Sequence, residues 1–402
     1  MSMKRVFWLI WPILAALHAG GSAATLTVER GSDLQAVIDR AADNDTIIVG
    51  AKEFEARPRA FIDSLCGNCL DNRTPVEASY GFIVKDKALV IIGKDRDQSR
   101  LITRAGYGLF FVDSEGSVVQ NLTVSGGVRD LDGNATDAGI VVRRSRVRIE
   151  NVDIRDNDHR DSSVVVGIGG VFGREGADIT VTGCRIVNNG WDGVALYRGA
   201  TATVSDCLIK DGRGAGIGVT WDATCQAYRN EVTGFWKGIG SFGTSLVVAR
   251  NNLVHDNLGW GMIATGQSRL HAINNVIHHN GNCGLAPWST EAGGRIINNI
   301  ITANGWREQW VCPCVGVWNY GDWAKWDFHH NIVWGNEQGQ YQDIWDQTDI
   351  NGNLSVDPMF LGDGDYRLGP ESPARQAGDS LIYDRDGSRS DIGLYGGPQA
   401  RP

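Results

Sequence analysis

The stretch Asn252-Leu-Val-His-Asp-Asn257 decides the fold, because it recurs as Asn275-Val-Ile-His-His-Asn280 and Asn299-Ile-Ile-Thr-Ala-Asn304. Related segments extend this repeat in both directions. They start at Asn121, Asn151, Gly183, Asp206, Asn230, Asn252, Asn275, Asn299, Asn331 and Asn353. Most of these starts lie about 23 residues apart, and a fixed period in this range is typical of a solenoid.

The repeated segments are short, rich in β-branched residues and bounded by Asn, Gly and Asp, so they predict strands rather than helices. Three short strands and three turns fit in about 23 residues, which predicts coils stacked about 4.8 Å apart. Asn side chains at matching positions are expected to form hydrogen-bonded ladders from coil to coil. Most coils then carry a Gly followed by an apolar residue, which predicts the inward-facing start of one strand.

This pattern resembles the right-handed parallel β-helix, or pectate-lyase-like, superfamily. The resemblance covers roughly residues 25 to 395. It implies an all-β, single-domain solenoid of about 10–12 coils of 22–24 residues. Three coils are longer, and a short amphipathic helix within Gly31–Ala42 is expected to cap the N-terminal end.

The chain is expected to divide into five segments. They are a signal peptide (1–24), an N-terminal cap (25–50), irregular first coils with a Cys-containing excursion (51–120), the regular β-helix (121–355) and a closing segment that caps the C-terminal end (356–402). Lys4 and Arg5 precede an apolar run and a small-residue cleavage pattern, which predicts export to the periplasm or the medium. The apolar run is too short for a good membrane span, so no span is expected after cleavage.

The formal net charge is −9, and cleavage of the signal peptide would make it more negative. An acidic chain argues against nucleic acid as a partner. It still permits an anionic polysaccharide, because a local basic cleft would suffice. A monomer is expected.

Three long coils, starting at Asn121, Asn151 and Asn299, insert their extra residues just before the Gly strand. Insertions on one corner of a solenoid indicate a binding face. The outward positions of the Gly strands are mostly small, and aromatic residues flank them, which favours the stacking of sugar rings. The predicted substrate-binding residues are Trp191, Trp236, Trp260, Trp288 and Arg198. The alternative is that these residues have a structural role. The small residues would then allow tight stacking of the coils, and the Trp side chains would fill the corners.

Candidate catalytic residues border this floor: Asp192, Lys237, Tyr197, Arg143 and His159. Hydrolysis by paired carboxylates is disfavoured, because Val166 and Ala215 are the expected column neighbours of Asp192. The resemblance instead implies an eliminative reaction, which needs a base and a group that neutralises a uronate carboxylate. His159, in a charged insertion, is the best acid/base candidate, and the alternative is that this insertion is a solvated surface loop. Asp158-His159 also lacks the flanks of the Asp-Pro-His-Asp signature of alginate epimerases.

Asp130, Asp132 and Asp137 surround a Gly in the first insertion and resemble a calcium loop, and the alternative is an ordinary Asx-rich turn. Eight Cys in an exported chain indicate disulfides. Cys66 and Cys69 are expected to close their own loop, and Cys283 to pair with Cys312 or Cys314. Cys184 and Cys207 are expected as stacked small hydrophobes that lie close enough to bridge. A zinc site formed by Cys66, Cys69, Cys312 and Cys314 is an alternative only if the excursion crosses the groove.

Three function classes follow. The first is a secreted polysaccharide-active enzyme, eliminative on an acidic polysaccharide. The second is a non-catalytic glycan-binding or cell-surface protein on the same scaffold. An ice-binding solenoid would need a regular outward Thr column, and the outward columns here are mixed.

Overall fold

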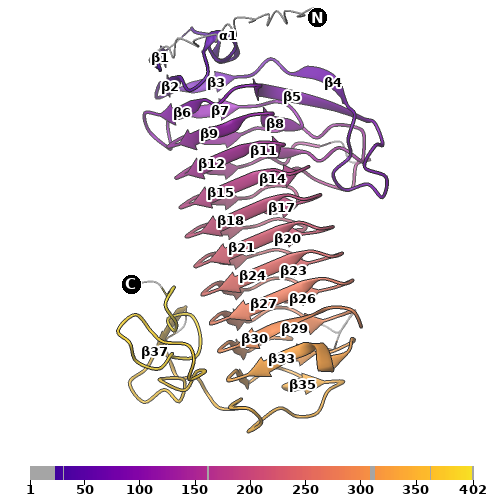
Figure 1. Ribbon diagram of the computed structural model, residues 1–402, viewed down its shortest axis with the longest axis vertical. Helices are drawn as coiled ribbons and strands as arrows, with labels where there is room; N and C mark the ends of the chain where they lie inside the picture. The colour runs from indigo at the N-terminus through magenta and orange to yellow at the C-terminus, as the bar shows by residue number, and fades with distance from the viewer. Residues whose placement is uncertain (1–22, 30, 161–162, 308–312, 363, 401–402) are drawn as a thin grey trace, which may run out of the picture.

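A computed structural model describes residues 23–29, 31–160, 163–307, 313–362 and 364–400. The chain forms a solenoid in which three long, mainly parallel sheets run the length of the molecule (Figure 1). They hold 12, 11 and 12 strands within the described ranges, which confirms the predicted fold class and is consistent with the expected number of coils. We name them sheets A, B and C.

Sheet A contains β1 (Thr25–Val28), β2 (Thr46–Val49), β6 (Val90–Gly93), β9 (Glu115–Gln120), β12 (Arg146–Glu150), β15 (Asp178–Thr182), β18 (Thr201–Ser205), β21 (Thr224–Tyr228), β24 (Leu246–Arg250), β27 (Arg269–Ile273), β30 (Gly293–Ile297) and β33 (Trp326–His329). Sheet B contains β3 (Glu53–Glu55), β7 (Arg100–Ile102), β10 (Thr123–Ser125), β13 (Asp153–Arg155), β16 (Arg185–Val187), β19 (Leu208–Lys210), β22 (Glu231–Thr233), β25 (Leu253–His255), β28 (Val276–His278), β31 (Ile300–Thr302) and β34 (Ile332–Trp334).

Sheet C contains β4 (Arg59–Asp63), β5 (Val76–Lys85), β8 (Tyr107–Val112), β11 (Ala138–Arg143), β14 (Gly169–Arg174), β17 (Val194–Leu196), β20 (Ala215–Val219), β23 (Lys237–Ser241), β26 (Trp260–Ala264), β29 (Cys283–Pro287), β32 (Val317–Trp318) and β35 (Tyr341–Gln342). Outside the three sheets lie the helix α1 (Leu34–Arg40), the 3-10 turn η1 (Trp323–Lys325) and the hairpin of β36 (Phe360–Gly362) and β37 (Asp365–Leu368).

The interior of the solenoid is one apolar core. Alternate residues of each short strand point inward, and the same position on the next coil stacks beneath them. In sheet C the inward column runs through Ile140, Val171, Val194, Ile217, Ile239, Met262 and Leu285. These side chains are fully buried, so burial explains why apolar residues recur once per coil.

The turn between sheets A and B contains a left-handed backbone residue on each of the nine coils from β9 to β33. The residues there are Asn121, Asn151, Gly183, Asp206, Arg229, Asn251, Asn274, Asn298 and His330, with φ between 45° and 65°. Asn, Asp and Gly adopt this conformation at the lowest cost. The predicted repeat register was therefore wrong by one residue from Asn230 onward, because Leu208 pairs with Glu231. In pairs such as Asn251-Asn252, the first Asn occupies the left-handed turn position and the second Asn occupies the ladder position. Because both positions hold Asn, the sequence does not show which of the two begins the repeat.

The second Asn of each pair forms the predicted ladder. The amide of Asn252 donates to Asn275 Oδ1 at 3.0 Å, and that of Asn275 donates to Asn299 Oδ1 at 2.9 Å. A second ladder runs from Asn257 through Asn280 to Asn304. The first ladder continues upward through two thiols, because the Cys207 backbone N–H donates to Asn230 Oδ1 at 3.1 Å.

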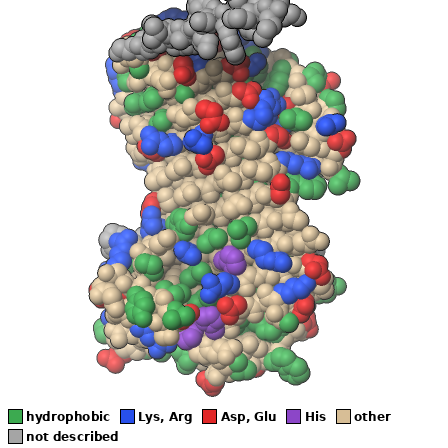
Figure 2. Space-filling model, viewed as in Figure 1, with side chains coloured by type: hydrophobic (Ala, Val, Ile, Leu, Met, Phe, Trp, Pro, Cys, Tyr) green, Lys and Arg blue, Asp and Glu red, His purple; other side chains and the backbone are tan. Residues whose placement is uncertain are grey.

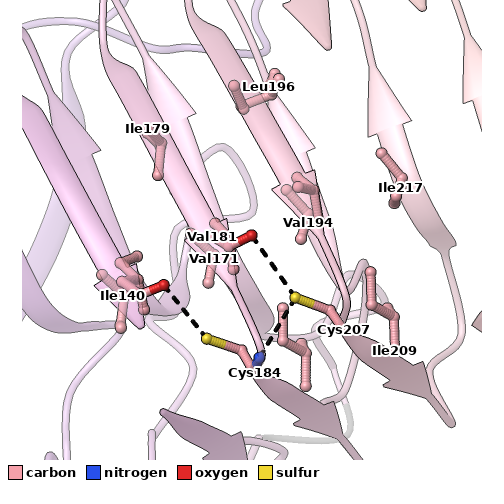
Figure 3. Packing of buried hydrophobic residues seen from close by; sticks show 14 of the residues in the cluster. Ile140, Val171, Ile179, Val181, Cys184, Val194, Leu196, Cys207, Ile209 and Ile217 are labelled. Carbon is pink, nitrogen blue, oxygen red and sulfur yellow. Dashed lines mark hydrogen bonds between the residues drawn. The ribbon is translucent and has the colours of Figure 1, made fainter. Parts of the chain in front are cut away.

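Cys184 and Cys207 occupy ladder positions within the apolar core (Figure 3). The backbone N–H of Cys184 donates to Cys207 Sγ at 3.4 Å, and both thiols face main-chain carbonyls. Both are free, buried cysteines, in agreement with the prediction that they are stacked small hydrophobic residues. A thiol fits the ladder here because it accepts one weak hydrogen bond and is otherwise apolar.

Removing a ladder side chain should destabilise the solenoid measurably. In Asn275→Ala, the Asn252 side chain loses its acceptor and the Ala249 carbonyl loses its donor. Unsatisfied buried polar groups cost about 1–3 kcal/mol each, so we expect about 2 kcal/mol less unfolding free energy by urea titration. Gln226→Ala, which removes an exposed amide on sheet A, is the control and should change the value by less than about 0.5 kcal/mol. Equal effects of the two substitutions would contradict a stabilising role for the ladder.

The N-terminal end carries the predicted helix. In α1, Asp33 Oδ1 accepts from the Ala36 backbone N–H at 3.2 Å, and Leu34, Val37 and Ile38 face the core. The helix thus covers apolar residues of the first coil. Within the described ranges no helix is long and apolar enough to cross a membrane. Most of the predicted signal peptide lies outside the described residues.

The C-terminal segment lies along the side of the solenoid, where the sequence predicted a cap on its end (Figure 1, lower left). The amide of Asn251 donates to the carbonyl oxygens of Leu394 and Gly396, at 2.9 and 2.7 Å. Apolar residues of sheet B pack against those of the segment. This cluster contains Val276, Ile300, Ile332, Ala374, Ile392 and Leu394. The turn column of left-handed Asn residues therefore also docks the C-terminal segment.

Candidate functional site

The N-terminal wall of the candidate groove on sheet C is the excursion between β3 and β5. β4 pairs antiparallel with β5, and the loop between them extends beside the next coils (Figure 1, upper right). Cys66 and Cys69 form a disulfide in this loop, as predicted. Because that bond consumes both thiols, the alternative of a zinc site using Cys66 and Cys69 is wrong.

Arg198, a predicted substrate-binding residue, holds this loop in place. Its guanidinium donates to the carbonyl oxygens of Gly67 at 3.3 Å, of Cys69 and of Leu70 at 3.2 Å. It also lies 3.9 Å from the ring centroid of Trp221. The structure therefore uses Arg198 to join the excursion to the coil after β17.

Buried Asp63 ties the base of the excursion to sheet C. Its carboxylate is ion-paired with Arg143 and, at 3.2 Å, with Arg174. The hydroxyl of Tyr107 donates to the same carboxylate at 3.1 Å, and burial raises the pKa of that hydroxyl. Arg143, a predicted catalytic residue, is thus placed in an internal ion pair under the excursion.

Arg174 was not among the predicted site residues, because the second insertion ends later in the sequence than predicted. Val171 pairs with Val194, so β14 places Phe172 and Arg174 at the outward positions expected for Gly169 and Val171. Gly169, and not Val166, is therefore the neighbour of Asp192 on the preceding coil. Several glycines between 167 and 173 fit the pattern, and only pairing with the neighbouring coils selects the register.

The excursion and the first two insertions enclose a pocket of about 140 Å³ above the floor of sheet C. Its lining includes Cys66, Asn68, Cys69, Thr136, Asp137, Gly167, Phe172, Trp191 and Tyr197. Phe172 and Tyr197 meet edge to face, with ring centroids 5.7 Å apart. The pocket forms the N-terminal end of the groove, and two of its aromatic side chains, Trp191 and Tyr197, were predicted site residues.

Asp192, Tyr197 and Lys237 lie together on the floor beside this pocket. Asp192 Oδ1 accepts from the Ala215 backbone N–H at 2.6 Å. Desolvation raises the pKa of Asp192 to about 6, although this hydrogen bond and the nearby charge of Lys237 oppose the rise. Burial lowers the pKa of Lys237, which Asp192 partly offsets. Burial and then the charge of Asp192 raise the pKa of Tyr197 well above its ordinary value. Three predicted catalytic residues are therefore electrostatically linked.

His159 lies on the rim and not on this floor. Its imidazole is exposed, and its backbone pairs with the first insertion, because its carbonyl accepts from the Arg129 N–H at 2.7 Å. A catalytic role for His159 stays a prediction.

The C-terminal half of the groove carries a chain of aromatic rings. Ring centroids of Trp236 and Trp260 lie 5.6 Å apart, those of Trp260 and Trp288 5.4 Å, and those of Trp288 and Trp318 4.9 Å, all nearly perpendicular. Trp260 and Trp318 are buried and fill the centre of the cluster. Trp236, Trp288 and the exposed Tyr320 offer the surfaces on which a sugar ring can stack.

Two arginines that sequence reasoning missed stand beside the corner tryptophans. The guanidinium of Arg213 lies 5.6 Å from the Trp191 ring centroid, and that of Arg307 lies 5.2 Å from the Trp236 ring centroid. Both arginines are exposed, so they provide positive charge along the rim. No repeat pattern marks them, because each lies in a turn or an insertion.

The three carboxylates of the predicted calcium loop have separate protein partners. Asp130 accepts from the Ser79 N–H at 2.9 Å, Asp132 from the Glu77 N–H at 3.0 Å, and Asp137 pairs with buried Arg129 at 2.6 Å. Among the residues that the structure describes, no three His, Cys, Asp or Glu side chains could hold a metal ion together. The geometry assigns this loop to docking against β5, and calcium binding stays a prediction.

The first insertion should make the free energy of unfolding fall as pH rises. Burial raises the pKa of Asp130, and burial and then the charge of Asp130 raise that of Asp137 to about 7. A raised folded-state pKa contributes stability that is present below about pH 4 and lost as pH rises through about 7. We expect urea titrations to give on the order of 1–3 kcal/mol less stability at pH 8 than at pH 5, since one pKa unit corresponds to about 1.4 kcal/mol.

Asp130→Asn should at least halve this pH dependence, because an amide at this position removes the repulsion while still accepting from Ser79. Asp132→Asn, on the same insertion, is the control. An unchanged pH dependence in Asp130→Asn would contradict the assignment of this pH dependence to Asp130 and Asp137.

The predicted pairing of Cys283 with Cys312 or Cys314 falls partly outside the described residues, because Cys312 lies there. Cys283 is fully buried and lies at the start of β29, beside the third insertion.

The fold and groove define a class: the chain is a right-handed parallel β-helix protein. A family model described as a right-handed β-helix region matches residues 167–337. Among solved structures, pectate lyase Pel9A is 14% identical with a TM-score of 0.54, over 94% of this chain and 97% of that chain. No curated protein sequence matches the chain.

Two further solved structures are similar at lower scores. The A-module of mannuronan C-5 epimerase AlgE4 from Azotobacter vinelandii is 14% identical (TM-score 0.42), over 80% of this chain and 89% of that chain. The catalytic unit of a GH87 α-1,3-glucanase from Streptomyces thermodiastaticus is 13% identical (TM-score 0.48), over 84% of this chain and 70% of that chain. Of the three, only the similarity to the pectate lyase bears on this chain, and it concerns the fold alone.

Proposed function

We propose that this protein binds an acidic polysaccharide along sheet C and cleaves it by β-elimination, with Lys237 as the base. The observation that carries the proposal is the linked group of Lys237, Asp192 and Tyr197 on the groove floor, where burial lowers the pKa of the amine. A neutral amine is needed to accept a proton, and burial makes it available at a lower pH than for an exposed lysine.

The substrate class follows from the charges around this floor. A uronate carries a carboxylate next to the carbon that loses its proton, and positive charge beside that carboxylate lowers the barrier. Arg213, one coil before Trp236, supplies such a charge at the rim. Asp192 would stabilise the ammonium that forms on Lys237, and Tyr197 is the nearby hydroxyl that can return a proton to the departing sugar oxygen.

The rim and the aromatic rings support binding of a polymer rather than a small molecule. Trp191 lies beside the pocket at one end of the groove, and Trp236, Trp288 and Tyr320 lie towards the other. Surfaces spread over several coils match successive sugar rings in one chain.

The test is a screen of the purified mature protein with pectate, alginate and glycosaminoglycans. Elimination leaves an unsaturated uronate that absorbs near 235 nm, whereas hydrolysis adds reducing ends without that absorbance. Parallel reactions with calcium and with a chelator test the predicted use of calcium. Reducing ends without absorbance would overturn the eliminative mechanism.

A second candidate function is glycan binding without catalysis. It is favoured because Arg143 and Arg198, both predicted for the site, are engaged with the excursion instead. Retention on a glycan column with no product in any reaction would support it. The charged and apolar pattern of residues 1–24 supports export in either case, and peptide sequencing of the secreted protein tests it.

A further inference from the structure

A second pocket, of about 500 Å³, lies between sheet A and the C-terminal segment, away from the groove on sheet C. Its lining includes the cations Arg250 and Arg295, the carboxylates Asp379 and Asp384, and the side chains of Ile273, Ile297, Ile382 and Tyr383. Figure 2 shows Lys or Arg and His side chains on the lower half of this face, among Asp or Glu and hydrophobic side chains.

Three arginines and one histidine lie on three neighbouring strands of sheet A at this place. Arg250, His271 and Arg295 come from the successive strands β24, β27 and β30, and Arg269 shares β27 with the histidine. Burial lowers the pKa of His271, and Arg295, Arg250 and Arg269 lower it further. In the strand register His271 pairs with Arg295, and of these four residues Arg250 and Arg295 line the pocket.

Two of the carboxylates nearby, Asp379 and Asp384, line the pocket itself, and within the described ranges neither is ion-paired with Arg250 or Arg295. Asp327 lies 3.4 Å from Arg295 Nε, Asp379 lies 3.9 Å from His329, and Asp384 accepts the backbone N–H groups of Gly397 and Asp391. Arg269 donates to three main-chain carbonyl oxygens. Asp327 is thus the one carboxylate ion-paired with the cluster among the described residues.

Two buried polar atoms of the cluster have no hydrogen-bond partner within the described residues. They are Arg250 Nε and His271 Nδ1. Buried polar atoms usually have a hydrogen-bond partner, and of these two residues Arg250 lines the pocket. An oxyanion is the natural partner of a guanidinium, because its oxygens accept the parallel N–H groups.

We propose that this pocket is a second binding site for a carboxylate-bearing saccharide. The guanidinium groups of Arg250 and Arg295 would hold the carboxylate. The apolar walls, formed by Ile273, Ile297 and Ile382, would cover one face of the sugar ring, and Tyr383 borders the opening. The site lies outside the catalytic groove, so it would anchor a second part of an acidic polymer and raise the local concentration of substrate.

The test uses isothermal titration calorimetry of the full mature protein with a galacturonate trimer, at low salt and early enough to avoid turnover. We expect two binding sites in the natural protein and one in Arg250→Gln/Arg295→Gln, or a weakening of that site by at least about tenfold. Arg148→Gln is the matched control, since Arg148 is exposed on sheet A outside the pocket. Two unchanged sites in the double variant would overturn the proposal.

Two further experiments distinguish binding at this site from binding in the groove and from nonspecific binding of an anion. Trp236→Ala/Trp288→Ala should remove the groove site and leave the sheet A site, so failure of either proposal is seen independently. A trimer with its carboxylates reduced to alcohols should lose the sheet A site. Displacement of the natural trimer by inorganic phosphate at matched ionic strength and equal concentration would overturn the saccharide assignment.

Discussion

Lys237→Met is expected to lower the rate of unsaturated product formation about 10²–10⁴-fold, the range over which a positioned general base contributes. Lys237 is half-buried on the groove floor, and its Nζ lies 6.0 Å from the ring centroid of Trp260. Methionine keeps the length and the apolar packing of the side chain and removes the proton acceptor. The initial rate at 235 nm on the polysaccharide found active in the screen measures the effect.

Lys237→Arg is the sharper comparison. A guanidinium keeps the positive charge beside Asp192 and the contact with Trp260 but does not lose its proton in proteins. It should therefore bind substrate with a similar KM and be as inactive as Lys237→Met. Lys210→Met, at an exposed position on sheet B, controls for the loss of a lysine. Activity of Lys237→Arg within tenfold of the natural protein would assign Lys237 to charge neutralisation and would exclude it as the base.

The pH profile follows from the same groups. The rate should rise as Lys237 loses its proton, at a pH below that of an ordinary lysine because burial lowers its pKa. Asp192, with a pKa of about 6, should be ionised over that range and stabilise the ammonium product. In Asp192→Asn the rise should move to lower pH, because the carboxylate no longer favours the charged amine, and the maximal rate should fall.

Asp63→Ala is expected to lower the free energy of unfolding by about 3–5 kcal/mol, the cost of removing one partner from a buried ion pair. The Asp63 carboxylate is fully buried and interacts with Arg143, Arg174 and the Tyr107 hydroxyl. Its removal leaves two guanidinium groups without their shared counter-ion. Urea titration followed by tryptophan fluorescence measures the loss.

Asp113→Ala is the matched control, because Asp113 pairs with Arg144 at 2.6 Å at the surface, where more than a third of each side chain is exposed. Such a pair contributes less than about 1 kcal/mol. The excursion should also detach from the groove in Asp63→Ala, so hydrogen exchange of residues 59–80 should become faster. A loss below 1 kcal/mol in Asp63→Ala would contradict the role of this carboxylate as the anchor of the groove wall.

Asp63 also shows why the site was only partly predictable. The floor residues Asp192, Tyr197 and Lys237 share columns that repeat with each coil, so counting along the sequence brought them together. Arg143 sits in the predicted column as well, but its partner comes from the excursion, which follows no repeat. A residue count therefore placed the backbone of Arg143 and could not show that Asp63 engages its guanidinium.

The sequence by itself determined the solenoid, its strands, the Asn ladders and the capping helix. Each depends on interactions that recur at every coil or lie within one helix, so the pattern is visible in the residues alone. The tertiary structure decided which glycine region begins β14, where the C-terminal segment docks, and how the excursion closes one end of the groove. Those features depend on single contacts between residues far apart in the chain, such as Arg198 with Cys69 and Asn251 with Leu394, and a contact made once leaves no period in the sequence.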